Sequence, residues 1–314
     1  MKEMLAVSEK NFIVVDHINP YLLPGPDIMV SPRSKPFFRV PEMVYGSKPT
    51  DGGNFLFTPE EKDELVAKNP RAEKWIRPFL GADEFIKGKK RFCLWLVDCP
   101  PDELRKMPLV YERVKNVREF RLKSKKAATR KNADKPTLFA EIRQPKTNYI
   151  LVPRHSSERR RYIPLGYVSR EIICGDSNQM IPNADLFHFG VLTSSVHMNW
   201  MRLVCGRLKS DYRYSATIVY NPFPWPLFYL DSEKPQVEAT AQKILDARKN
   251  YPQATLADLY DENSMPSDLS KAHAENDAAV MKLYHFPPDM NEMVMQIQLL
   301  YMYDALSKDF GEEE

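Results

Sequence analysis

The sequence predicts an α+β fold, in which a mixed β-sheet with several helices is followed by an all-α region. Short β-type runs separated by Pro and Gly alternate with helical stretches over residues 1–225, whereas residues 226–314 show only helical apolar periodicity. Charge changes at the same place, because residues 1–225 hold 38 Lys+Arg and 25 Asp+Glu, and residues 226–314 hold 7 and 17. We therefore expect two domains, 1–225 and 226–314, for which 314 residues are sufficient.

The first elements lie in a Pro- and Gly-rich segment with short β-type runs at residues 12–15 and 55–57. A helix is predicted over residues 59–68, because Thr58 can cap it and Glu61 completes a capping box. Residues 91–98 then alternate in the manner of a half-buried strand.

A long basic helical stretch is predicted from Pro101 to about residue 133. Positions 110, 114, 117, 121 and 125 share one helical face, which begins apolar and becomes basic. The usual alternative is a solvated face, but residues 105–135 hold 12 basic and 3 acidic residues, which favours phosphate contact. The expected phosphate-binding residues are Lys123, Lys125, Lys126, Arg130 and Lys131.

Three β-type segments follow, over residues 136–144, 148–154 and 162–168, and the last two flank a charged loop. Arginine is typical of contacts with the phosphate backbone or a groove of DNA. In the alternative, Arg160 pairs with Glu158 and the other arginines are solvated, and the sequence leaves both possibilities open. The arginines of this loop are Arg154, Arg159, Arg160 and Arg161.

The rest of the first region is predicted to contain strands over residues 171–181 and 184–189, then a helix over residues 191–205. A last β-type run, residues 216–220, precedes a Pro-Phe-Pro-Trp-Pro block. Beyond that block the apolar periodicity predicts helices over residues 233–250, 255–260, 268–284 and 289–308. Asp289 and Glu292 are the expected N-cap pair of the last helix.

The most informative segment is GRLKSDYRYS, residues 206–215, which interleaves basic, aromatic and acidic side chains. Lysine can donate to the groove edge of guanine, and aspartate can accept from the amine of cytosine, so Lys209 and Asp211 could read both members of a G·C pair. Two residues apart in an extended segment, they would point the same way. An ordinary solvated Lys–Asp pair is the alternative.

The neighbours of this pair fit a DNA-binding surface. Arg207 and Arg213 flank it and could hold phosphates, while Tyr212 and Tyr214 could pack beneath. A basic surface of this kind predicts duplex DNA as the partner. The acidic second region would be repelled by DNA phosphates, so we expect it to face away from them or to lie against another protein domain.

GRLKSDYRYS, with the YNPFPWP that soon follows, resembles the end of the target-recognition domain in MmeI-like restriction–modification methyltransferases. These are large single-chain enzymes that methylate adenine in DNA. The number and order of the matching stretches make the resemblance specific, and it covers residues 18 to about 305. The other stretches are INPYLLPGPD, GSKPTDGGNF, RPFLGADEFI, CLWLVDCPPDEL, EFRLKSKKAATRK, LFAEIRQPKTNYILVPRHSSERRRYIPLGYVS and FHFGVLTSSVHMNWMR.

The resemblance implies a base-reading role for Lys209 and Asp211, because the matching positions vary in this family with the base pair recognised. It also implies that the chain is the duplex-recognition module of a larger S-adenosylmethionine-dependent adenine methyltransferase, working with a methyltransferase catalytic domain of the parent enzyme. The chain has no Gly-rich cofactor turn, and the turns at Asn19 and Asn221 lack the second proline of an Asn-Pro-Pro-aromatic motif. We therefore expect no catalytic residue and no cofactor in this chain, with S-adenosylmethionine bound elsewhere in the parent.

Two alternatives come from other classes of protein. Fragments of a serine-hydrolase signature suggest a standalone hydrolase using Ser177 and His188, although chance explains their close spacing better. The second alternative is a protein-interaction scaffold whose basic face binds an acidic partner.

The remaining composition bounds the environment of the protein. Its four cysteines have no zinc-ligand spacing, so we expect reduced thiols and no metal site. The sequence contains no apolar run long enough to span a membrane and no signal peptide, which predicts a cytoplasmic protein without a membrane partner.

Overall fold

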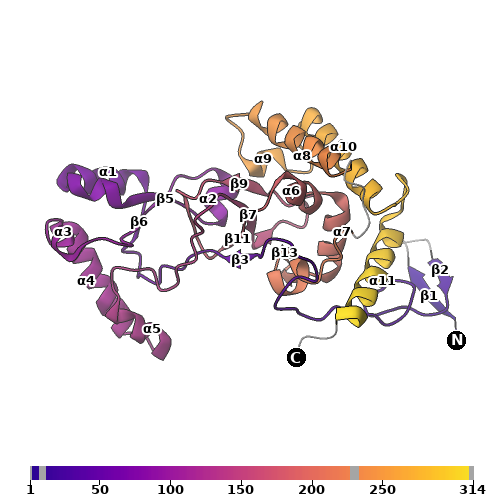
Figure 1. Ribbon diagram of the computed structural model, residues 1–314, viewed down its shortest axis with the longest axis horizontal. Helices are drawn as coiled ribbons and strands as arrows, with labels where there is room; N and C mark the ends of the chain where they lie inside the picture. The colour runs from indigo at the N-terminus through magenta and orange to yellow at the C-terminus, as the bar shows by residue number, and fades with distance from the viewer. Residues whose placement is uncertain (1, 7–11, 227–232, 311–314) are drawn as a thin grey trace.

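The computed structural model describes residues 2–6, 12–226 and 233–310, and the fold is α+β as predicted. The molecule is elongated (Figure 1), and one end of its long axis carries the helices α1 (Pro59–Lys68), α3 (Pro101–Arg105), α4 (Pro108–Leu122) and α5 (Ala127–Lys131). Helix α11 (Glu292–Phe310) and the hairpin of β1 (Glu3–Ala6) and β2 (Phe12–Val15) lie at the other end. Between the two ends run the central strands and the helices packed on them.

The end that carries α1 is built on a four-stranded sheet in the order β10-β5-β6-β4. Strand β10 is parallel to β5 and the other pairs are antiparallel, so the sheet is mixed. Helix α1 begins after Thr58, which forms the predicted capping box with Glu61. The elements of this part are β4 (Leu56–Phe57), α1 (Pro59–Lys68), η1 (Pro70–Trp75), β5 (Ile76–Leu80), α2 (Ala82–Lys87), β6 (Phe92–Leu94) and β10 (Ile173–Cys174).

The predicted long basic helix is broken into α3 (Pro101–Arg105), α4 (Pro108–Leu122), α5 (Ala127–Lys131) and the 3₁₀ turn η2 (Asn132–Asp134). The first break has a local cause, since Met107 precedes a proline and adopts an extended φ of −121°. After α4, the side chain of Ser124 accepts a hydrogen bond from the Lys126 amide, which turns the chain. We call α4, α5 and η2 together the basic arm.

Arg121 in the basic arm has a structural role that the sequence did not reveal. It is fully buried, and its guanidinium donates hydrogen bonds to five backbone carbonyls. An arginine can be buried when its donors are satisfied in this way, so the expectation that this face turns basic toward phosphates is wrong at this position. The accepting carbonyls belong to Pro49, Thr50, Asn132, Lys135 and Leu138.

The central sheet is antiparallel, in the order β3-β11-β7-β9. Its strands are β3 (Val44–Tyr45), β7 (Tyr149–Pro153), β9 (Gly166–Val168) and β11 (Asn178–Pro182). The strand predicted over residues 171–181 is therefore two strands, β10 and β11, that belong to different sheets. The strand predicted over residues 136–144 is wrong, because that segment makes only an isolated bridge between Lys48 and Glu141.

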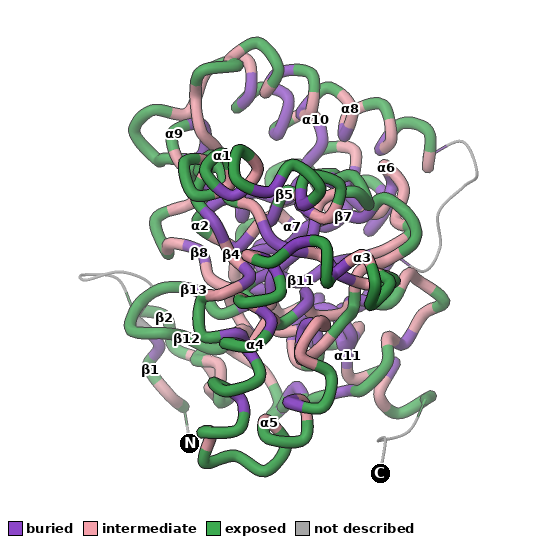
Figure 2. The backbone as a smooth tube through the Cα atoms, turned by 90° about the vertical axis from the view of Figure 1, so that its left-hand side faces the viewer, coloured by how far each residue is buried: buried purple, intermediate pink, exposed green. Residues whose placement is uncertain are grey.

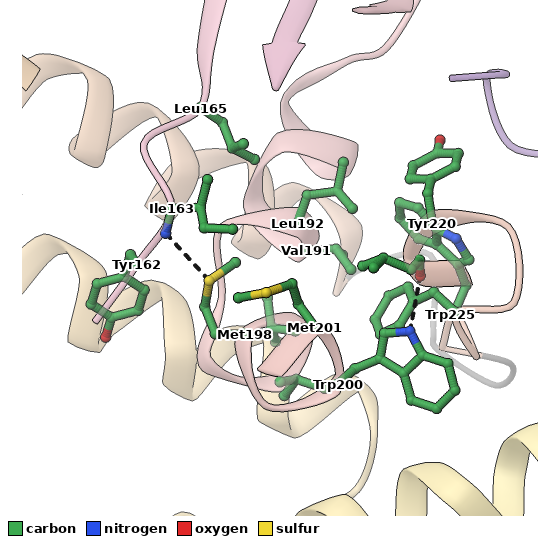
Figure 3. Packing of buried hydrophobic residues seen from close by; sticks show 14 of the residues in the cluster. Tyr162, Ile163, Leu165, Val191, Leu192, Met198, Trp200, Met201, Tyr220 and Trp225 are labelled. Atoms are coloured by element: carbon green, nitrogen blue, oxygen red, sulfur yellow. Dashed lines mark hydrogen bonds between the residues drawn. The ribbon is translucent and has the colours of Figure 1, made fainter. Parts of the chain in front are cut away.

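Two further β predictions are replaced by helical structure. Residues 184–189 lead into α6 (Leu186–Leu192), because Asp185 forms a capping box with His188 that outweighs the β preference of the aromatic residues. Residues 216–220 form a π-helical turn, η3 (Ala216–Tyr220). The indole of Trp200 in α7 (Ser195–Val204) donates to the Val219 carbonyl in that turn at 2.9 Å, the bond drawn from Trp200 in Figure 3.

The predicted C-terminal helices are present as α8 (Lys234–Lys249), α9 (Leu256–Leu259), α10 (Ser267–Leu283) and α11 (Glu292–Phe310). Asn291 rather than Asp289 accepts a hydrogen bond from the Met293 amide at the start of α11. Buried residues from both sides of Pro226 belong to one apolar cluster, and Figure 2 shows buried segments running through the middle of the molecule. In the described part of the chain, no helix combines the length and apolar character needed to cross a bilayer.

Candidate nucleic-acid interface

The segment predicted to read DNA bases forms an exposed β-hairpin. Strand β12 (Gly206–Leu208) pairs with β13 (Asp211–Arg213), and Lys209 and Ser210 form the turn between them. Lys209 has a left-handed φ of 56°, which allows the tight turn. The expected extended segment is therefore wrong: Lys209 lies at the hairpin tip and Asp211 begins the second strand, yet both side chains remain exposed.

Aromatic side chains lie beneath the hairpin, as expected from the sequence. Tyr212 and Tyr214 are buried, and the Arg207 guanidinium lies 4.3 Å from the centre of the Tyr212 ring. The Tyr214 hydroxyl is hydrogen-bonded to His197 Nε2 at 2.8 Å. Complete burial lowers the pKa of His197 to about 3, so it is neutral at physiological pH. The sequence contained no signal for this pair, because the partners are linked only by the fold.

The structure brings the arginine-rich loop directly to this hairpin. Strand β8 (His155–Ser156) pairs with β13 and completes a three-stranded sheet in the order β12-β13-β8. The Tyr214 amide donates to the Arg154 carbonyl at 2.8 Å, and the Glu158 amide donates to the Asp211 carboxylate at 3.3 Å. We call residues 157–161 the arginine loop, and the hairpin and this loop together the reading face.

The four predicted arginines of this region are not equivalent. Arg159 and Arg161 are exposed. Arg160 is half-buried and donates to the Ser156 hydroxyl at 3.3 Å, and no ion pair joins it to Glu158 within the described chain. Arg154 is also half-buried: it donates to the Asp176 carbonyl and lies 5.0 Å from the centre of the Tyr45 ring.

Positive charge concentrates where the loop meets the hairpin. Burial lowers the pKa of His155, and the nearby charges of Arg154 and Arg213 lower it further. Burial also lowers the pKa of Arg160, which the carboxylates of Asp211 and Asp261 partly offset. The charges of Arg154 and Arg213 at His155 show a positive potential at this place, which favours anions.

The basic arm lies apart from the reading face along the long axis of the molecule (Figure 1). Its predicted phosphate contacts are exposed, and Arg130 donates to the carbonyls of Ser124 and Lys125. None of its four predicted lysines has a carboxylate within 4.0 Å in the part of the chain that the structure describes. These are Lys123, Lys125, Lys126 and Lys131.

The acidic second region does not lie wholly away from the basic surfaces. A cavity of about 570 Å³ is lined on one side by Arg159, Arg160 and Arg161 and on the other by Asp261 and Glu262, in the loop between α9 and α10. The acidic region therefore meets the arginines at this loop, and its placement away from DNA phosphates stays a prediction.

The residues of the hydrolase alternative have separate structural tasks. The Ser177 hydroxyl accepts a hydrogen bond from the Ala82 amide, and His188 takes part in the capping box with Asp185, 2.5 Å from its carboxylate. No hydrogen bond joins Ser177 to His188 in the described residues. Over those residues there is also no cluster of three metal-ligating side chains.

In the two turns that resemble part of a methyltransferase motif, the asparagine side chains are hydrogen-bonded to the backbone of this chain. The side chain of Asn19 accepts from the amides of Tyr21 and Leu23, and the Asn221 amide group donates to the Arg33 carbonyl at 2.8 Å. Both asparagines are buried. Neither is therefore available to hold a target base.

Comparison with known proteins gives a consistent picture. Residues 24–227 match the family model of the MmeI target recognition domain, and residues 229–310 match that of the MmeI C-terminal domain. DNA methyltransferase A of Bacillus subtilis (strain 168) is 39% identical over 272 residues, which are 86% of this chain and 31% of that protein. A structure of the type IIL restriction–modification enzyme MmeI in complex with DNA superimposes with a TM-score of 0.91 and 45% identity, over 96% of this chain and 40% of that one. The chain thus spans less than half the length of either relative.

Proposed function

This chain belongs to the MmeI family of target-recognition and C-terminal domains, and from that premise we propose that it is the sequence-reading module of a larger DNA adenine methyltransferase of the restriction–modification type. Its task is to bind duplex DNA, select the sequence and present the target adenine to a catalytic domain of the parent enzyme. The module acts in the cytoplasm, where that DNA is found. Residues 1–225 form the recognition domain and residues 226–314 the helical domain, a division supported by the two family matches.

The observation that carries this proposal is the reading face. One three-stranded sheet joins the exposed hairpin to the arginine loop, so groups suited to base edges and groups suited to phosphates share one surface. Lys209 and Asp211 read bases, each contributing about 1–3 kcal/mol of discrimination. The phosphate contacts come from Arg207 and Arg213, from the arginines at positions 154 and 159–161, and from the basic arm.

S-adenosylmethionine binds elsewhere in the parent enzyme, where it supplies the methyl group. The sequence offers no Gly-rich turn to hold that cofactor, and the buried turns at Asn19 and Asn221, which would have to hold the target base, are held by backbone contacts of their own. The contribution of this chain to methylation is therefore positioning of the DNA, and no chemical step passes through its side chains.

Selection of binding sites from a random pool of duplex DNA tests the proposal. The chain of residues 1–314 should enrich one short motif, and its affinity should fall steeply as salt rises, because phosphate contacts release counterions. Binding without any enriched motif would contradict sequence reading. Preference for an acidic protein over duplex DNA in a competition at low and high salt would favour the scaffold alternative instead.

A further inference from the structure

The two ends of the arginine loop are attached to parts of the molecule that lie far apart in the sequence. On its N-terminal side, β8 joins the hairpin strand β13. On its C-terminal side, Tyr162 follows Arg161 directly and turns into the protein, where it is almost completely buried. The position of the loop therefore depends on what holds Tyr162.

Tyr162 is held by helix α10 of the C-terminal region. Its hydroxyl donates to the Asp277 carboxylate at 2.6 Å, and its ring stacks on His273, with the ring centres 4.1 Å apart and 21° between the planes. The other carboxylate oxygen of Asp277 accepts from the Ser195 amide at the start of α7, at 2.7 Å. One buried carboxylate thus joins the end of the arginine loop to two helices.

Residues on both sides of Tyr162 are also hydrogen-bonded to side chains of the helices α7 and α8. The Ile163 amide donates to Met198 Sδ at 3.4 Å, a bond that Figure 3 draws with Ile163 turned toward Met198. Arg202 donates to the Arg161 carbonyl at 2.5 Å, and Arg248 of α8 donates to the Leu165 carbonyl at 2.5 Å. Residues 161–165 are therefore tied to α7, α8 and α10 together.

His273 is in turn fixed by the same helical region. Its Nε2 is hydrogen-bonded to the Tyr260 hydroxyl at 2.8 Å, and Tyr260 accepts a hydrogen bond from the Arg248 guanidinium. Burial keeps the pKa of His273 well below its ordinary value, so the ring that stacks on Tyr162 is neutral. A support held by several buried hydrogen bonds reduces the freedom that the loop would lose on binding DNA.

We propose that Tyr162, Asp277 and His273 are positioning residues for DNA binding, through which the C-terminal helices hold the arginine loop in the reading face. The C-terminal region then contributes to phosphate binding without touching DNA. This inference rests on the proposed function, since it assigns a position to arginines that contact phosphates.

Tyr162→Phe tests the proposal in the complete chain, because it removes the bond to Asp277 and keeps the ring. The matched control is Tyr284→Phe, since Tyr284 is also buried and its hydroxyl donates to the Pro224 carbonyl at 2.9 Å, away from the loop. The measurements are the melting temperature and the affinity for a short mixed-sequence duplex at several salt concentrations. For Tyr162→Phe we expect several-fold weaker binding and a salt slope smaller by about one, the loss of one phosphate contact.

The control should lower the melting temperature and leave the affinity and the salt slope unchanged. Asp277→Asn should change the binding in the same direction as Tyr162→Phe but less, because a neutral amide accepts more weakly than a carboxylate. If Tyr162→Phe and Asp277→Asn change only the melting temperature, as the control does, the proposal is overturned. If the unchanged chain does not bind duplex DNA at all, the proposed function itself fails and this inference fails with it.

Discussion

The reading face and the basic arm are both rich in Lys and Arg, but they hold their charges in different ways. On the reading face, Arg207 lies over Tyr212, Arg160 bonds Ser156, and Asp211 accepts from the Glu158 amide. In the basic arm, the four predicted lysines extend into solvent, and the only deeply buried cation, among the described residues, is Arg121. Side chains held in one position can contact particular base edges and so distinguish sequences. Lysines that extend into solvent contact phosphates, which adds affinity for duplex DNA of any sequence.

The largest expected effect concerns the attachment of the basic arm. Arg121→Ala removes a fully buried side chain and leaves five backbone carbonyls without their donor, so we expect a loss of at least about 3 kcal/mol in the free energy of unfolding. Urea unfolding measures this loss. Arg118→Ala, an exposed position in the same helix, is the control and should cost less than about 0.5 kcal/mol. An equal and small cost for both variants would mean that Arg121 does not anchor the arm.

The second effect is a pH dependence from His197, which is hydrogen-bonded to Tyr214 next to the reading face. The folded pKa of His197 is lowered to about 3, so its stabilising effect is complete above the unfolded value of 6.5 and is lost as pH falls below that value. Between pH 6.5 and 5, protonation of this residue in the unfolded chain should lower the free energy of unfolding by about 2 kcal/mol. Urea unfolding at pH 7 and pH 5 should show a smaller loss for His197→Gln than for the unchanged chain. Residues 46–147, which include the basic arm, contain no histidine and add nothing to this dependence.

The third effect tests the free charges of the basic arm. Replacing Lys125 and Lys126 together by Gln should weaken binding to every duplex and reduce the salt slope by about two. Removing the same charge from the helical region, with Lys249→Gln and Lys308→Gln, should leave the slope unchanged, since both lysines already face Asp246 or Asp304. Equal changes in slope for the two double variants would place the DNA somewhere other than along the arm.

Local sequence signals predicted those parts of the fold whose cause is local. The capping box at Thr58 and Glu61, and the apolar periodicity of α8 and α10, depend on residues within a few turns of the chain. The turn η3 was missed because its Val219 carbonyl accepts a hydrogen bond from the indole of Trp200, a residue outside the segment. The buried role of Arg121 was missed for the same reason, because the sequence around a helical arginine does not show which distant carbonyls it will contact.

The candidate site follows the same rule. The residue types of the segment at positions 206–215 indicated an exposed basic surface over buried tyrosines, and the structure has that surface. The left-handed backbone of Lys209, which converts an extended segment into a hairpin, is unusual for a lysine and has no local sequence signal. Contacts such as Asp211 with Glu158 and Tyr162 with Asp277 arise only when separate segments meet.

The most direct test compares the two basic regions by binding-site selection. Exchanging Lys209→Glu together with Asp211→Arg should change the enriched base pair at one position while the domain stays folded. The Lys125→Gln and Lys126→Gln variant should enrich the motif of the unchanged chain with lower affinity. An unchanged motif after the hairpin exchange, or a changed motif after neutralising the arm, would contradict the assignment of base reading to the hairpin.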